Sequence, residues 1–281
     1  MTLDSIIEEA RRRGASDVHV EPGLPLTLRV RGKLVSGSDP VPRAGVEAIA
    51  RELLLGDEWS AFLARRSADL SRTVRGVRCR INVLMSLRGV GLAVRLLPAT
   101  RPTLERLNLH PELRRFADAH HGLVIVSGPT GSGKSSTLSA LVEEINQSEA
   151  RHILTLEEPI EHVFRPRKSL IRQREVGRDT PSFEQGLIDA LREDPDVIVV
   201  GELRDPTTMR LALNAAETGH LVFTTLHSSS TGEALQRLVM AFPAEIQGSV
   251  AAQLGDCLVG AICQRLRYRP DLDLRIPECE I

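Results

Sequence analysis

Residues 128–135 read GPTGSGKS and match the phosphate-loop spacing G-x-x-x-x-G-K-S. Glycines at these positions let consecutive backbone N–H groups turn toward phosphate oxygens, and a helix starting near Gly133 would add its positive end. Lys134 would neutralise the β- and γ-phosphates of ATP, and the Ser135 hydroxyl would hold Mg²⁺. The predicted nucleotide-binding residues are Gly128, Pro129, Thr130, Gly131, Ser132, Gly133, Lys134, Ser135 and Ser136.

A flexible strand–helix turn would also be rich in glycine, so the flanking residues decide between the two interpretations. The apolar run GLVIVSG precedes the motif, and Leu138, Leu141, Val142 and Ile145 follow it at helical spacing. A phosphate loop requires a strand before it and an amphipathic helix after it. The sequence therefore favours a nucleotide site.

A second stretch, DPDVIVVGELRD at 194–205, predicts a buried strand over Val197–Val200 that ends close to Glu202. In a parallel sheet the strand tips lie along the edge that carries the phosphate loop. A carboxylate there can orient or deprotonate the water that attacks the γ-phosphate. The alternative is an exposed acid at a strand end. Asp205 before Pro206 predicts a helix N-cap with proline at the first helical position.

Composition limits the class of protein. The 281 residues are 42% hydrophobic and 26% charged, which suits one or two domains with a real core. A net charge of −1 and 3% aromatic residues disfavour nucleic acid as the partner. No apolar run approaches the roughly 18 residues that span a bilayer, and we recognise no signal peptide. Four cysteines without a CxxC pair indicate reduced thiols in a cytoplasmic protein.

Periodicity predicts two domains. Residues 1–97 read as a small α+β domain: a helix over 3–13, a half-buried strand opening a hairpin at Gly32, helix over 44–66, and two strands broken near Arg88-Gly89. Residues 98–108, with two prolines, read as a linker. Residues 109–281 alternate apolar strands with helices, including 183–193 and 206–217, and so predict an α/β domain with a mostly parallel sheet.

Several segments together resemble the four motifs of the secretion-superfamily ATPases, the hexameric motors of type II secretion and type IV pili. They are GPTGSGKSST, TLEEPIEHVF, QREVGRDTPSFEQGLIDALREDPDVIVVGELRD and TGHLVFTTLHSSS. The resemblance runs over essentially the whole chain and is greatest to the pilus-retraction ATPases. It implies a PAS-like N-terminal domain, a RecA-like P-loop NTPase domain, and a homo-hexamer. It also implies a peripheral location on an inner-membrane pilus platform protein.

The resemblance also implies roles for individual residues. Glu202 matches the glutamate of an atypical second Walker motif, in which Gly201 stands where an aspartate is usual. Glu157, Glu158 and Glu161 match an acidic box, although Glu158 replaces the usual aspartate. His220 and His227 match a histidine box. His227, at a predicted strand tip, is favoured as a nucleotide sensor, whereas His220 could cap the preceding helix.

Arginines of the N-terminal domain have two interpretations. Arg72, Arg75, Arg78, Arg80, Arg88 and Arg95 could form a solvated sheet face, the ordinary place for scattered charges. In the family, however, arginines of one subunit reach the phosphates bound by the next. Arg80 and Arg95 match the family patterns RxRxN and A-[IFV]-R, so the resemblance implies that both act in trans.

The departures from the family favour its retraction branch. The paired CxxC motifs of extension and type II secretion ATPases are absent, as is their long N-terminal extension. The chain stops at PECEI, before the C-terminal helices that the resemblance implies. The expected function is an ATP-hydrolysing, Mg²⁺-dependent motor for pilus retraction and twitching motility. The alternatives are an extension or type II secretion ATPase without its zinc module, and a nucleotide-switched regulator that is not a motor.

Overall fold

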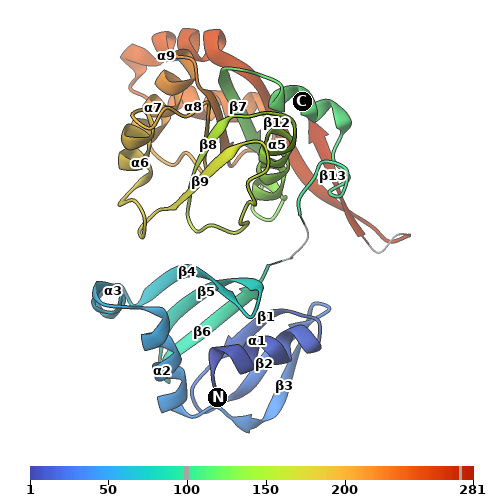
Figure 1. The fold of residues 1–281 in the computed structure, drawn as a ribbon, viewed down its shortest axis with the longest axis vertical. Coiled ribbons are helices and arrows are strands. Elements are labelled where there is room, and N and C mark those ends of the chain that lie inside the picture. Colours follow the sequence, from blue (N-terminus) through green and yellow to red (C-terminus); the bar gives the residue numbers. More distant parts are fainter. Residues whose placement is uncertain (98–100, 272–273) are drawn as a thin grey trace. The chain divides into compact units, whose positions relative to one another are not determined.

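The computed structural model describes residues 1–97, 101–271 and 274–281. The chain divides into two compact units, Met1–Thr100 and Arg101–Ile281, and each is described here by itself (Figure 1). Residues 98–100 of the expected linker lie outside the described residues. The rest of that segment, 101–108, belongs to the second unit.

The first unit is an antiparallel sheet covered by helices. Within the described residues its strand order is β3-β2-β1-β6-β5-β4. The strands are β1 (Ala15–Val20), β2 (Pro25–Val30), β3 (Lys33–Pro40), β4 (Ser67–Val74), β5 (Val77–Ser86) and β6 (Gly89–Leu96). The helices are α1 (Leu3–Arg12), α2 (Arg43–Leu53) and α3 (Asp57–Arg65). The α+β prediction is confirmed.

Sequence periodicity accounts for this packing. The four apolar side chains predicted to share one face of α1 are all buried, namely Leu3, Ile6, Ile7 and Ala10. The predicted hairpin turns at Gly32, where Val30 of β2 pairs with Lys33 of β3. The helix predicted over 44–66 is in fact two helices, because Gly56 has φ of +56° and interrupts it.

The second unit contains the mostly parallel sheet that the sequence predicts. Its described strand order is β13-β12-β7-β11-β10-β8-β9, and β13 pairs with β12 in antiparallel fashion. The strands are β7 (Gly122–Ser127), β8 (His152–Glu157), β9 (Leu170–Glu175), β10 (Val197–Val200), β11 (Leu221–Leu226), β12 (Leu258–Arg269) and β13 (Leu274–Glu280). The helices are α4 (Arg114–Ala117), preceded by the 3-10 turn Pro111–Leu113, α5 (Lys134–Ser148), α6 (Phe183–Ala190), α7 (Pro206–Glu217), α8 (Thr231–Met240) and α9 (Ala244–Cys257).

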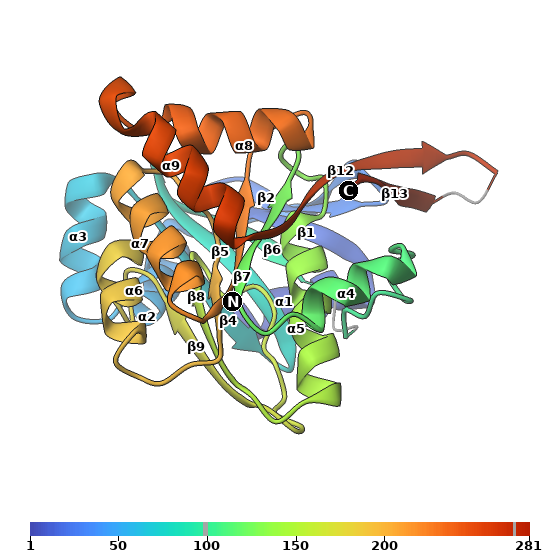
Figure 2. The same cartoon turned by 90° about the horizontal axis from the view of Figure 1, so that it is seen from above.

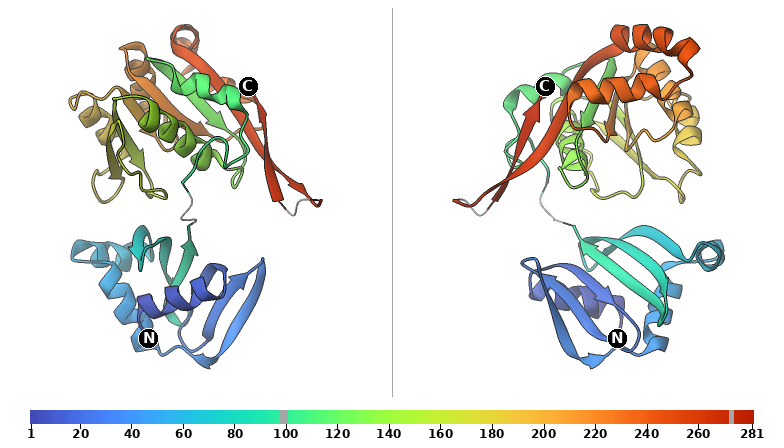
Figure 3. Two further views of the ribbon diagram at one scale, coloured as in Figure 1. Left: turned by 45° about the vertical axis from the view of Figure 1, so that its right-hand side comes forward. Right: turned by 180° about the vertical axis from the view of Figure 1, so that it is seen from behind.

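Apolar layers cover both faces of this sheet. Leu123 and Ile125 of β7 pack with residues of α6–α9, whereas Val124 and Val126 pack with α4 and α5. Figure 2 shows these two groups of helices on opposite sides of the sheet. The hairpin β12–β13 extends from one edge of the unit (Figure 3). Every helix among the described residues is too short or too polar to cross a bilayer.

Candidate nucleotide site

The loop between β7 and α5 has the backbone shape that its glycines predict. Gly128, Gly131 and Gly133 have φ of +143°, +78° and +90°, a region that favours glycine. A Cβ atom on Gly128 would lie 2.2 Å from the carbonyl oxygen of Gln264, which only a glycine avoids. Residue 134 is the first of α5, so the loop ends at a helix N-terminus, where free N–H groups attract anions.

Lys134 lies inside this loop. Its residue is 8% exposed, and its ammonium group donates to the carbonyl oxygens of Gly128 at 2.9 Å and Pro129 at 3.1 Å. Burial lowers the pKa of Lys134, and the negative charge of Glu202 partly opposes that shift. A buried cation held against loop carbonyls is well placed to meet phosphate oxygens.

The structure brings Lys134, His227 and Glu202 together. Nδ1 of His227 lies 3.5 Å from Nζ of Lys134, and Nε2 of the same ring lies 3.3 Å from Oε1 of Glu202. Because an ammonium can only donate, Nδ1 must accept and Nε2 must carry the proton that points to Glu202. His227 therefore connects the phosphate loop to the carboxylate.

Sheet topology places these groups on one edge. Val200 of β10 pairs with Thr224 of β11, and Thr224 pairs with Ile125 of β7. All three strands are parallel, so the residues that follow them gather at the same end. The prediction that Glu202 faces the phosphate-loop edge is thus explained by the order β7-β11-β10.

Arg204, to which no role is assigned from the sequence, contacts two acids of this edge. Its Nε donates to Oε2 of Glu202 at 3.0 Å, and Nη1 donates to Oε2 of Glu158 at 2.7 Å. Partial burial lowers the pKa of Arg204, but these two carboxylates outweigh it and leave the pKa raised. Glu202 is therefore held between a histidine and an arginine. The adjacent Asp205 accepts from the N–H of Thr208 at 2.9 Å, as predicted for an N-cap.

The acids after β8 occupy different surroundings. Oε1 of Glu157 accepts from Oγ1 of Thr155 at 2.7 Å and from Nε2 of Gln173 at 3.0 Å, so that oxygen faces β9. Glu158 is exposed and contacts Arg204, while Glu161 is half-buried in the segment that follows. Residues 158–169 form no helix, as Pro159 predicts. Arg204 thus connects Glu158 to Glu202.

His220 has the structural role that was its alternative. Its Nδ1 lies 2.9 Å from the carbonyl oxygen of Ala215 in the last turn of α7. A histidine at a helix C-terminus satisfies one of the free carbonyls there. His220 therefore caps α7, whereas His227 lies among the nucleotide-site residues.

Arg80 and Arg95 are cross-strand partners on β5 and β6 of the first unit. Their side chains are 39% and 65% exposed on the face opposite the core. Arg80 lies 3.6 Å from Asp69, and Arg95 lies 2.9 Å from Asp17. Like charges directly opposite each other repel, so these carboxylates offset the repulsion. The outward, partly exposed placement suits contact with another molecule.

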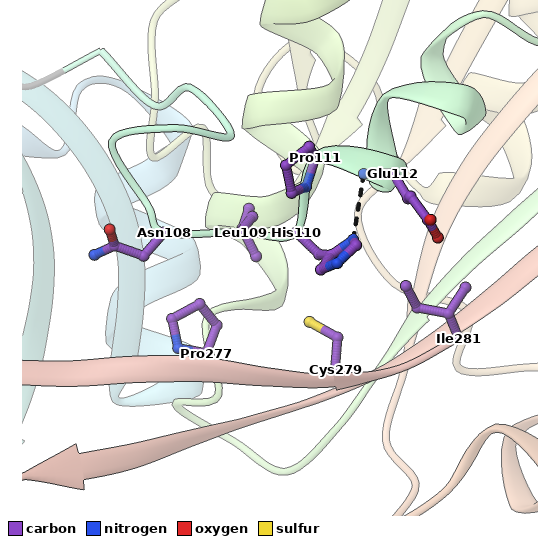
Figure 4. Close-up of a pocket in the computed structure, with 8 residues that line it drawn as sticks. All are labelled: Asn108, Leu109, His110, Pro111, Glu112, Pro277, Cys279 and Ile281. Carbon is purple, nitrogen blue, oxygen red and sulfur yellow. Dashed lines mark hydrogen bonds between the residues drawn. The ribbon is translucent and has the colours of Figure 1, made fainter.

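A separate groove of about 540 Å³ lies in the second unit, beside β13 (Figure 4). It is lined by Asn108, Leu109, His110, Pro111, Glu112, Pro277, Cys279 and Ile281. Nδ1 of His110 accepts from the N–H of Glu112 at 3.3 Å, and burial raises the pKa of Cys279. The groove shares no residue with the phosphate loop.

The chain is similar to known ATPases over most of its length. The type IV pilus retraction ATPase PilT of Pseudomonas aeruginosa is 42% identical over 268 residues, which are 95% of this chain and 78% of that protein. A crystal structure of the pilus retraction motor PilT with bound ADP has a TM-score of 0.93 at 40% identity, and covers 100% of this chain and 82% of that one.

A second solved structure and a family model extend the match. The ATPase DotB of Legionella pneumophila has a TM-score of 0.89 at 30% identity, with 99% of this chain and 79% of that one covered. The model of the family described as "Type II/IV secretion system protein" matches residues 1–275. With its α/β fold, phosphate loop and strand-tip glutamate, the chain belongs to the type II/IV secretion system protein family.

Proposed function

We propose that this chain hydrolyses ATP with Mg²⁺ and works as a homo-hexameric motor that retracts type IV pili. The observation that carries the proposal is the connected series Lys134–His227–Glu202 beside a phosphate loop. It joins a phosphate-binding cation to a carboxylate that can act on water. Similarity to a retraction ATPase over 95% of the chain supports retraction rather than extension of the pilus.

The residues present suit a magnesium nucleotide. The loop has positive φ at Gly128, Gly131 and Gly133, as expected where backbone N–H groups turn toward phosphate oxygens. Ser132 has a buried hydroxyl with no hydrogen-bond partner among the described residues, and Ser135 is exposed at the start of α5. Bound Mg²⁺ would neutralise charge that develops on the phosphates, and Ser135 would be its protein ligand.

The side chains of the site have separate roles in binding and hydrolysis. The loop N–H groups and Lys134 hold the phosphates, and the carboxylate of Glu202 orients or accepts a proton from water. His227 couples Lys134 to Glu202. If Lys134 shifts toward phosphate, Nδ1 of His227 loses its contact with the ammonium group. Arg204 competes for Glu202: its ion pair with that carboxylate holds it until the site rearranges, and a second ion pair, with Glu158, keeps the arginine in place. Glu157 and Glu161 are proposed to lie further from the metal than Ser135, as acids around its water ligands.

A peripheral location on an inner-membrane pilus platform protein completes the proposal. The rival from the same family is an extension or secretion motor, and the rival from another class is a regulator that binds ATP without turning it over. Deletion of the gene, together with an ATPase assay of the purified chain, distinguishes all three. Deleting the gene should leave pili that extend but do not retract, scored by fluorescence microscopy of labelled pili, while the purified chain hydrolyses Mg²⁺-ATP in a coupled-enzyme assay.

Two results contradict this proposal in different ways. Loss of pili on deletion would indicate an extension motor. ATP binding without turnover, in a preparation whose oligomeric state is measured by light scattering, would indicate a regulator. A Glu202→Gln strain serves as the control, because it should reproduce the deletion while the protein is still made.

The arginines give a separate prediction about assembly. If Arg80 and Arg95 act on the neighbouring subunit, turnover per chain should rise steeply with protein concentration and then level off. Arg80→Gln and Arg95→Gln should each lower the plateau at least about 10²-fold with little change in ATP affinity, since guanidinium groups supplied in trans contribute 10³–10⁵ in rate. Folding should be little affected, because both arginine side chains are partly exposed and ion pairs in contact with solvent contribute little.

Arg29→Gln is the matched control, since Arg29 lies on β2 of the same sheet and contacts the Gly32 carbonyl. Steady-state assays across a dilution series, with sedimentation velocity at each concentration, test the prediction. A flat profile from monomers, or a plateau unchanged in both variants, would remove the arginines from the site.

A further inference from the structure

Gln264 is the buried polar side chain that touches the phosphate loop from outside. It lies on β12, is 2% exposed, and belongs to none of the motifs that identify the nucleotide site. β12 runs parallel to β7, with Cys263 in register with Ser127, the residue before the loop. At this register the hydroxyl Oγ of Ser127 donates to the carbonyl oxygen of Ile262 at 3.1 Å.

The side-chain amide of Gln264 joins the loop to α5. Its Nε2 donates to the carbonyl oxygen of Ser132 at 2.6 Å, and its Oε1 accepts from Oγ1 of Thr137 at 2.6 Å. Thr137 lies in the first turn of α5 and is 1% exposed. Each end of one amide is therefore satisfied by a different part of the phosphate-binding element.

The loop also closes around this residue. A Cβ atom on Gly133 would lie 2.8 Å from Nε2 of Gln264, and one on Gly128 would lie 2.2 Å from its backbone oxygen. Two glycines of the phosphate motif thus leave space for Gln264. The phosphate motif and β12 therefore pack closely against each other at Gln264.

The hydrogen bond to the Ser132 carbonyl sets the direction of a neighbouring backbone N–H group that can donate to phosphate. The peptide unit between Ser132 and Gly133 is planar and trans, so its C=O and N–H point in opposite directions. Anchoring the Ser132 carbonyl on Gln264 therefore aims the Gly133 N–H away from β12. In a phosphate loop the N–H groups cradle the phosphates.

We propose that Gln264 is a positioning residue that fixes the Ser132–Gly133 peptide plane and so presets the loop for phosphate. This rests on the nucleotide site of the proposed function. Its role is in binding rather than in the chemical step, because it contacts loop and helix but not Glu202. An amide is required, since the loop side needs a donor and the helix side needs an acceptor.

Gln264→Met keeps the length of the side chain and removes its hydrogen bonds to the Ser132 carbonyl and to Thr137, together with the weak contact of Sγ of Cys279 at 3.8 Å. Its dissociation constants for ADP and ATP, measured by isothermal titration calorimetry, should rise at least about tenfold, as expected when buried polar partners are left unpaired. The single-turnover rate at saturating ATP should stay within about threefold of wild type. Gln264→Glu should behave like Gln264→Met, because a carboxylate cannot donate to the Ser132 carbonyl.

Gln253→Met is the matched control, because Gln253 lies on α9 and bonds to Asn214 and Glu217 of α7. It should leave nucleotide affinity unchanged. A merely structural role for Gln264 would lower the melting temperature without nucleotide and reduce the active fraction, but leave the dissociation constant of the folded fraction unchanged. That result would overturn the proposal, as would a lower single-turnover rate at unchanged affinity.

If Gln264→Met does not fold, Thr137→Val tests the other end of the same contact. It should raise the dissociation constant for ADP about threefold or more, since one of the two anchors is lost; unchanged affinity would overturn the proposal. ADP affinity does not depend on turnover. A wild-type chain that binds ADP but hydrolyses no ATP would therefore contradict the proposed function and leave the test of Gln264 intact.

Discussion

Replacing Glu202 with glutamine should leave ATP affinity close to wild type and lower single-turnover hydrolysis about 10²-fold or more, the usual scale for a general base. The carboxylate follows the buried strand β10, so the backbone that carries it stays fixed. His227 and Arg204 each direct an N–H to a different oxygen of Glu202. Glutamine offers one acceptor oxygen, so it also loses one of these contacts.

Glu158→Gln is the matched control, because Glu158 binds the other side of Arg204 and is exposed. It should change turnover far less. ATP affinity and single-turnover hydrolysis measured side by side also separate the alternatives. If Glu202→Gln changes neither affinity nor rate, Glu202 is only an exposed acid at a strand end. If Mg²⁺-dependent affinity and rate fall together, Glu202 is a metal ligand.

Lys134→Ala should abolish measurable ATP binding and turnover. The ammonium is the buried cation of the phosphate loop, and its removal leaves the loop itself with backbone dipoles alone to hold the phosphates. The folded state should tolerate the change, because burial already disfavours the charged form of Lys134. Lys168→Ala, an exposed lysine that contacts the Ser148 carbonyl, is the control and should behave as wild type.

Calorimetric titration of both lysine variants with ATP, followed by a turnover assay, measures the effect. Circular dichroism of the two variants should coincide, which separates a binding defect from misfolding. Turnover at the wild-type level in Lys134→Ala would contradict the phosphate-loop assignment.

The sequence predicts much of this fold because several signals are local. The apolar run before Gly128 gives a strand, and Asp205 before Pro206 gives the start of α7, because each depends only on near neighbours. The strand-tip position of Glu202 follows in the same way from β10. The order β7-β11-β10, which brings Glu202 to the loop, follows from the rules for parallel sheets.

Other features escape prediction because they depend on distant contacts. β9 and β13 are edge strands whose charged and apolar residues mix, so they lack the continuous apolar run of a buried strand. The role of Arg204 as a link between Glu202 and Glu158 appears only when β8 and β10 pair. Gln264 is an ordinary polar residue until β12 lies beside the loop.

The burial of β7 on both faces has a consequence for cooperativity. Leu123 and Ile125 belong to one apolar layer, and Val124 and Val126 belong to the other. Neither layer can melt without exposing the strand that carries the other, so the two layers should unfold in one transition. A ligand held at the end of β7 would therefore stabilise α4 and α5 as well as α6–α9, although these groups of helices lie on opposite sides of the sheet.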